Sequence, residues 1–159
     1  MTASHDLFGD VADALLGLLP DELGAPRQRW HRYGIKVWFG PEKPTREHYE
    51  AQVISPRHVA DATVLALEVG FHAEHPKPAE NAAVLGELVA AERRWRKKLG
   101  PDAVAGPFLG RDSWTRVSET WPDPDLGEDD LALELATRLI DYITTLEPVL
   151  RSRGGAVRG

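Results

Sequence analysis

Residues 63–121 constrain the fold most, because they combine the signals of a strand, a helix and a second strand in succession. The first part, 63–72, is rich in β-branched and large apolar residues, which are typical of a strand. A period of two places Glu68 and His72 on one face and apolar side chains on the other. The apolar face consists of Leu65, Leu67, Val69 and Phe71. We therefore expect a strand with one face in the core.

A helix is predicted between Pro78 and Leu99. Proline is tolerated in a first helical turn, and apolar residues follow at spacings of three and four. Lysines and arginines crowd the last turns, where the helix dipole favours cations, and Gly100 stops the helix. A loop containing glycine and proline over 105–110 then leads to a strand predicted over 113–121.

One helix and two strands are predicted before this segment. Ser4 caps a helix over 5–19, whose broad apolar stripe needs cover from a sheet or a second subunit, so we expect a homodimer. Residues 29–39 predict a strand, and residues 47–54 predict a second strand antiparallel to it. The face of the first strand that points away from the core carries Trp30, Arg32, Lys36 and Trp38.

The C-terminal part predicts a proline-broken acidic loop and a last helix from about Leu131. Pro148 should end or kink this helix because proline lacks a backbone donor, and residues 151–159 then form a frayed tail. The predicted order is α-β-β-β-α-β-α. This order indicates an α+β class with a mostly antiparallel four-stranded sheet and three helices, in a single domain over 1–150.

The composition excludes several classes of function. The 159 residues contain no cysteine, which excludes disulfides, thiolate catalysis and cysteine-bound metals in this sequence. No apolar run reaches the roughly 18 residues that span a bilayer, and no signal-peptide pattern opens the chain. We therefore expect a cytoplasmic protein without a membrane partner. A net charge of −6 weighs against nucleic acid, and the cations at 93–98 are explained more simply as a solvated helix end.

The polar faces of the predicted strands hold the candidate binding residues. Tryptophan offers flat apolar contact, while histidine, lysine and glutamate offer directional hydrogen bonds, a mixture that ligand sites and protein interfaces favour. A solvated face, or one covered by the terminal helices, is the alternative. The predicted ligand-binding residues, for a small ligand or a protein partner, are Lys36, Trp38, His48, Glu50, Glu68 and His72.

Histidines and carboxylates also raise the question of metal binding and catalysis. Histidine is a common zinc ligand, but two histidines three apart at a strand end point to different sides of the chain. We therefore predict no metal, no cofactor and no catalytic residue. An enzyme would need Glu50 and Glu68 on adjacent strands for acid/base work, which leaves a small hydrolase-like enzyme as an alternative. The histidines considered as metal ligands are His48, His58, His72 and His75.

Three stretches together resemble an uncharacterised bacterial α+β domain found in restriction-associated and defence-associated proteins. They are residues 67–72, the helix before Gly100 with its basic motif at 92–98, and residues 113–117. The resemblance implies a link to nucleic acid and carries over no site residue. The residues themselves favour a binding or interaction domain that uses the polar sheet face, with a hydrolase-like enzyme or a nucleic-acid-associated accessory module as the alternatives.

Overall fold

The structure is a computed structural model that describes residues 7–42 and 45–153. Its helices are α1 (Leu7–Leu18), α2 (Pro78–Ala90), α3 (Glu92–Leu99) and α4 (Leu131–Ser152). Its strands are β1 (Arg27–His31), β2 (Gly34–Trp38), β3 (Glu47–Ile54), β4 (Ala66–Ala73), β5 (Val104–Phe108) and β6 (Arg111–Pro122). The strands form one sheet in the order β1-β2-β3-β4-β6-β5, and all neighbouring strands are antiparallel.

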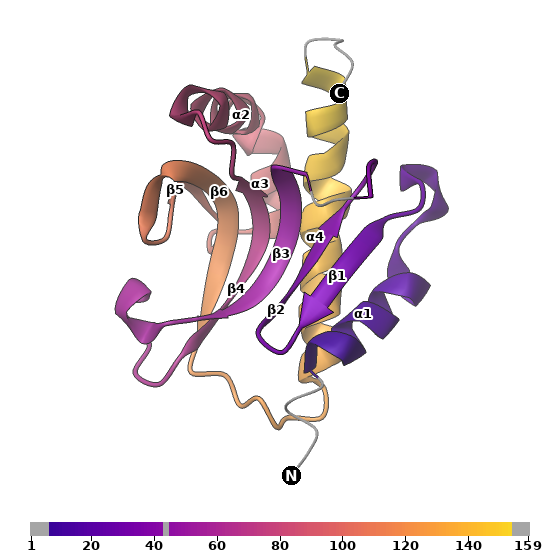
Figure 1. Cartoon of the computed structure of the whole chain (residues 1–159), viewed down its shortest axis with the longest axis vertical. Coiled ribbons are helices and arrows are strands. Elements are labelled where there is room, and N and C mark those ends of the chain that lie inside the picture. Colours follow the sequence, from indigo (N-terminus) through magenta and orange to yellow (C-terminus); the bar gives the residue numbers. More distant parts are fainter. Residues whose placement is uncertain (1–6, 43–44, 154–159) are drawn as a thin grey trace.

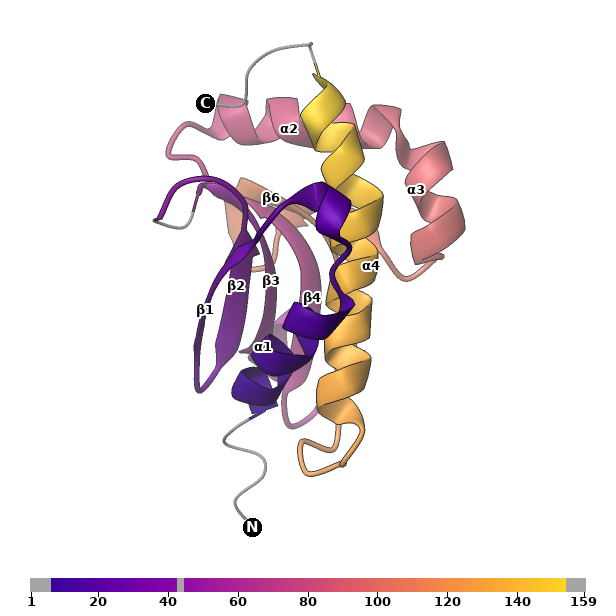
Figure 2. The ribbon, with the colours of Figure 1, turned by 90° about the vertical axis from the view of Figure 1, so that its right-hand side faces the viewer.

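The helices are distributed unevenly around the sheet. Helices α1 and α4 lie along one face, α2 crosses one end of the sheet, and α3 packs beside α4 (Figures 1 and 2). The described residues thus contain four helices and six strands, so the predicted α+β class and antiparallel sheet are confirmed, whereas the predicted counts of three and four are wrong.

The core fills the space between the sheet and helices α1 and α4. Leu67, Val69 and Phe71 are fully buried on the face of β4 that points to α4, as the alternation predicted. The apolar stripe of α1 packs against α4 and β1. The chain's own sheet and last helix therefore cover the buried part of this stripe, whereas Leu16 and Leu18 are 68% and 45% exposed, and the homodimer stays a prediction.

The single strand predicted over 29–39 is wrong, because a hairpin lies there. Arg32 and Tyr33 form the turn between β1 and β2. The reversal places Trp30 opposite Ile35, a core residue, so Trp30 is on the side of helix α1 instead of beside Lys36. A continuous alternation concealed the turn, because its two central residues are not usual turn residues and only Gly34 after them is one.

The helix predicted over 78–99 is interrupted at Ala91, where φ is −100° and ψ is 7°. The buried indole of Trp95 donates a hydrogen bond of 2.7 Å to the carbonyl of Leu88 in the last turn of α2. The same carbonyl accepts from the backbone N–H of Ala91, so the indole adds a second bond at the end of α2 and holds α3 against it. From α3, the guanidinium of Arg96 donates hydrogen bonds to the carbonyls of Gly100 and Ala103, just beyond the end of the helix.

Two predicted irregular segments are regular. The loop predicted over 105–110 includes most of β5, an edge strand, where Pro107 is tolerated because no partner needs its missing donor. Helix α4 continues through Pro148 to Ser152 because Leu146 and Leu150, on either side, are fully buried. The predicted cap Ser4 and residues 154–159 of the predicted tail lie outside the described residues. Within the described part, no helix is long and apolar enough to cross a membrane.

Candidate metal centre

The strand register brings the predicted site residues to one side of the sheet. Residues paired across an antiparallel sheet point to the same side, and alternation places Trp38 on the side of Lys36. All six predicted ligand-binding residues therefore share the face opposite α4, which we call the polar face. The pairs that establish this are Lys36 with Glu50, Gln52 with Glu68 and His48 with His72.

The polar face is largely enclosed. The exposed fraction is 2% for His48 and 0% for both Glu68 and His72. The ring of Phe108, from the edge strand β5, contacts the His72 ring edge-on, with centroids 4.8 Å apart. Ionisable groups in such a place must find partners, because burying an unpaired charge costs several kcal/mol or more.

A close approach of two strands accompanies this enclosure. Gly70 lies between Glu68 and His72 on β4 and has a φ of 155°, where side chains are rarely tolerated. A Cβ at this position would lie 2.3 Å from the carbonyl oxygen of Val117 in β6. Glycine therefore lets β4 and β6 pack together in the middle of the polar face.

Two imidazoles and two carboxylates converge at the end of the polar face where β3 begins and β4 ends. His48 and His72 each direct one nitrogen toward the same two carboxylates, Glu50 and Glu74. The Nε2 atom of His48 lies 3.1 Å from Glu50 Oε1 and 3.5 Å from Glu74 Oε2. The Nδ1 atom of His72 lies 3.0 Å and 3.4 Å from the same two oxygens.

These separations fit a bound metal ion. Zinc binds histidine nitrogens and carboxylate oxygens at about 2.0–2.2 Å, so the ligand atoms of a tetrahedral ion lie about 3.3–3.6 Å apart. The four nitrogen–oxygen separations span 3.0–3.5 Å, and one donor atom of each residue lies within 4.8 Å of the others. Lengthening the two shortest of these separations slightly would bring all four nitrogen–oxygen separations into the range for a zinc ion.

Both histidine rings are oriented by a hydrogen bond on the side away from the cluster. His48 Nδ1 donates to the Thr45 carbonyl over 3.0 Å, so the neutral ring has its lone pair on Nε2. His72 Nε2 donates to Glu68 Oε2 over 2.7 Å, which leaves the lone pair on Nδ1, and Gln52 donates to the other oxygen of Glu68. Carbonyl and carboxylate partners of this kind orient most metal-bound histidines.

Without an ion, the same contacts favour charged side chains. Burial lowers the pKa of His48 and His72, but the surrounding carboxylates outweigh it, and both pKa values lie above the ordinary 6.5. Burial raises the pKa of Glu50, yet hydrogen bonds with the two imidazoles bring it down to about 2. The pKa values of Glu68 and Glu74 are lowered for similar reasons. When no metal ion is bound, the protons on His48 and His72 therefore offset the negative charge of the carboxylates around them.

A divalent ion can replace these two protons without changing the net charge of the site. The two imidazoliums together carry the charge of one such ion, and the carboxylates stay ionised in both forms. Arg116, paired with His72 across β4 and β6, donates to Ser118 on the same face and adds one positive charge near Glu68. The enclosed site is therefore charge-balanced for a divalent cation.

The predicted residues divide into three roles in this arrangement. His48, Glu50 and His72 converge as possible ligands, and Glu68 orients His72. Lys36 and Trp38 lie beside the cluster without supplying a donor atom to it. The expectation that no metal binds rested on His72 and His75, which do point to different sides, because His75 contacts Glu47 on the other face.

Glu74 is the residue that the sequence interpretation missed. The predicted strand ended at His72, whereas β4 continues to Ala73 and the alternation carries the next side chain back to the polar face. A period of two continued through 68, 70, 72 and 74 was the available signal. His58 lies outside the cluster.

Comparison with models of protein families, with curated proteins and with solved structures finds no match to this chain. The resemblance to a defence-associated domain therefore stays a prediction.

Proposed function

We propose that this protein is a metal-binding domain that holds one divalent transition-metal ion on its polar face. The ligands are His48 Nε2, His72 Nδ1 and carboxylate oxygens of Glu50 and Glu74. The observation that carries the proposal is the convergence of these four donor atoms, all within 4.8 Å of one another, with nitrogen–oxygen separations close to those around a zinc ion. The proposal makes the ligand predicted for the polar face a metal ion instead of a small molecule or a protein partner.

Zinc is the ion that suits this set of donors best. Imidazole nitrogens are ligands for zinc and its neighbours in the first transition row, whereas calcium prefers six to eight oxygens and magnesium keeps several waters. The four ligands include no sulfur, which argues against copper(I). Cobalt(II) takes similar sites and absorbs visible light, so it serves as a spectroscopic substitute.

The arrangement supports a firmly held ion more than a hydrolytic one. Four protein ligands complete the tetrahedral shell that is typical of structural zinc sites, whereas catalytic sites keep a position for water. Ligands come from both β3 and β4, so the ion would cross-link the two central strands. The hydrolase-like enzyme and the nucleic-acid module gain no comparable support.

The direct test is metal binding by the purified full-length protein. After removal of metal with a chelator, zinc titrated by calorimetry should bind with a stoichiometry of one. Cobalt(II) should give the strong visible absorption of a tetrahedral complex, and zinc should abolish it. An absence of binding above the level of a surface histidine would contradict the proposal.

Two histidine variants provide a matched comparison. His48→Gln removes a proposed ligand, and His75→Gln removes a half-buried histidine whose ring contacts Glu47 on the opposite face. The first variant should lose the cobalt spectrum and the second should keep it. Circular dichroism checks that both variants are folded, so that a lost spectrum reports the site and not the fold.

A further inference from the structure

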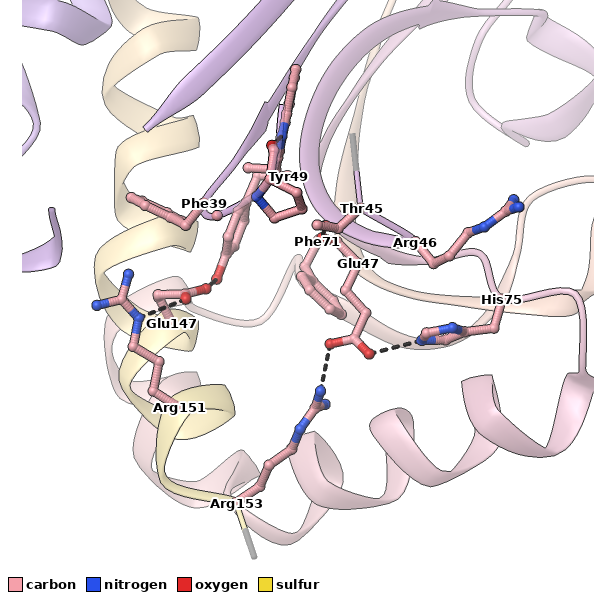
Figure 3. Close-up of a pocket in the computed structure, with 13 residues that line it drawn as sticks. Phe39, Thr45, Arg46, Glu47, Tyr49, Phe71, His75, Glu147, Arg151 and Arg153 are labelled. Atoms are coloured by element: carbon pink, nitrogen blue, oxygen red, sulfur yellow. Dashed lines mark hydrogen bonds and ion pairs between the residues drawn. The ribbon is translucent and has the colours of Figure 1, made fainter. Parts of the chain in front are cut away.

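A cavity lies on the other side of the same strands. It is a cleft of about 820 Å³ between the ends of β2 and β4, the beginning of β3 and the C-terminal turns of α4 (Figure 3). Small-molecule sites commonly have volumes of about 300–1,000 Å³. The cleft is therefore large enough for a metabolite-sized ligand.

Aromatic rings form the apolar part of the cleft. Tyr49 and Phe71 are almost fully buried and meet edge-to-face, with centroids 5.5 Å apart. Phe39 lies at the side, and the guanidinium of Arg151 lies 5.0 Å from the centre of its ring. Flat rings of this kind offer contact area to an apolar or aromatic ligand body.

Charged groups flank these rings in two separate pairs. Glu147 accepts hydrogen bonds from Tyr49 over 2.9 Å and from Arg151 over 2.8 Å. Glu47 accepts from Arg153 over 2.6 Å, and its other oxygen lies 2.8 Å from His75 Nε2. Figure 3 shows the Arg153 side chain reaching from the end of α4 to Glu47, across the cleft from the other pair. Both carboxylates already have donors.

One donor at the rim lacks a partner. The Nη1 atom of Arg153 is buried and makes no hydrogen bond within the described part of the chain. A buried donor without an acceptor is destabilising, and more so when it is charged. Because this atom has almost no accessible surface, a ligand in the cleft would reach it only by turning the guanidinium, whose planar fork matches a carboxylate.

We propose that the cleft binds a small organic acid with an apolar, preferably aromatic, body. Its carboxylate accepts a hydrogen bond from Arg153 Nη1, and its body packs on the rings of Tyr49 and Phe71. The cleft is on the face that packs against α4, so it takes its ligand independently of the proposed metal ion. No step in this inference depends on the metal.

A matched pair of probes tests the charge requirement. Calorimetric titration of the metal-free protein with 2-naphthylacetate should show binding. Its uncharged amide, 2-naphthylacetamide, should bind about 10- to 100-fold more weakly, the loss expected for a hydrogen bond to a charged group. Equal affinity for acid and amide, or no binding of the acid at millimolar concentration, would overturn the proposal.

Variants locate the binding within the cleft. Arg153→Gln should lower the affinity for 2-naphthylacetate by the same factor that separates the acid from its amide in the original protein. The affinity for the amide should not change. Arg153→Lys keeps the charge without the fork and should fall between the two, which excludes a general loss of folding. Arg57→Gln changes an exposed arginine that does not line the cleft and should have no effect. An unchanged affinity in Arg153→Gln would place the probe elsewhere.

A metal-site variant separates this proposal from the previous one. Under metal-free conditions, His48→Gln should bind 2-naphthylacetate with the affinity of the original protein, even if its zinc affinity is lost. Loss of zinc binding with retained acid binding would contradict neither proposal, and each proposal can fail alone.

Discussion

The two faces of β3 and β4 at their shared end neutralise their carboxylates in different ways. On the polar face, each of two imidazole nitrogens lies near both Glu50 and Glu74. On the other face, Arg151 pairs with Glu147 and Arg153 with Glu47, which His75 also contacts. Permanent cations neutralise the second set, whereas protons or an ion must neutralise the first.

The difference shows what a strand's period of two can do. Successive residues from Glu47 to Glu50 alternate between the cleft and the polar face, and so do Phe71 and His72. One pair of strands thereby separates an enclosed, proton-sensitive cluster from an open, aromatic cleft. Variants on one face should leave the properties of the other face unchanged.

The largest expected effect is that of pH on zinc affinity. Both imidazoles have raised pKa values, so zinc must displace up to two protons when the pH is below them. Apparent affinity should therefore fall by up to about 100-fold for each pH unit in that range. Calorimetry in buffers with different ionisation enthalpies should show the released protons. Affinity independent of pH between 5.5 and 7.5, about one unit either side of the ordinary histidine value, would contradict two-histidine ligation.

The metal-free protein should respond to pH in the opposite sense. Raised imidazole pKa values contribute stability that is complete below the ordinary 6.5 and is lost as the pH rises through the folded-state values. The lowered pKa of Glu50 contributes stability that is present above its ordinary 4.5 and is lost as the pH falls toward about 2. Urea unfolding should thus show greatest stability between these ordinary values, and added zinc should protect most at high pH.

The next largest effect distinguishes two glutamates on opposite faces. Glu74→Gln removes an ionised oxygen that lies near both imidazole nitrogens and should weaken zinc by more than the roughly 10- to 100-fold typical of outer partners. Glu47→Gln, which affects the pair with Arg153, should leave the zinc affinity unchanged. Competition with a chromogenic chelator measures both. Equal losses in the two variants would mean that the faces are not independent.

A smaller effect is expected for Glu68, which orients His72 and does not reach the ion. Glu68→Gln keeps an acceptor for His72 Nε2 but removes its charge, so zinc should weaken by about 10- to 100-fold. A cobalt complex should still form in this variant with a similar spectrum, because the four ligands remain. Complete loss of the spectrum would indicate that Glu68 is itself a ligand.

The sequence allowed the faces of the central strands to be predicted but not the cluster on them. Polar and apolar residues largely alternate in 47–53 and 67–72, so His48 and His72 could be placed on one side without coordinates. Whether their rings turn toward a common point depends on hydrogen bonds to the Thr45 carbonyl and to Glu68. Such contacts produce no periodic pattern in the sequence, so they cannot be predicted from it. The same residues therefore suggested a ligand face and not a metal ion.

Two other failures have local physical causes. The β1–β2 turn contains Arg32 and Tyr33, which carry no turn signal, so the pairing of the strands decided the structure there. The edge strand β5 includes Gly106 and Pro107, which argue for a loop, yet β6 supplies partners along its length. The cleft was not predictable for a related reason, since α4 brings Glu147 to residues about a hundred positions earlier in the chain.

The smallest effect tests the cleft face alone. Tyr49→Phe removes the hydroxyl that donates to Glu147 but keeps the ring against Phe71. Glu147 retains its bond to Arg151, so the free energy of unfolding should fall by only about 1 kcal/mol. Urea unfolding measures this change. The zinc affinity should stay the same, because Tyr49 points to the face opposite that of its neighbours His48 and Glu50, which are proposed ligands. A zinc affinity that fell in Tyr49→Phe as it does in Glu68→Gln would show that β3 transmits strain between its faces, and the two sites would then have to be treated as one.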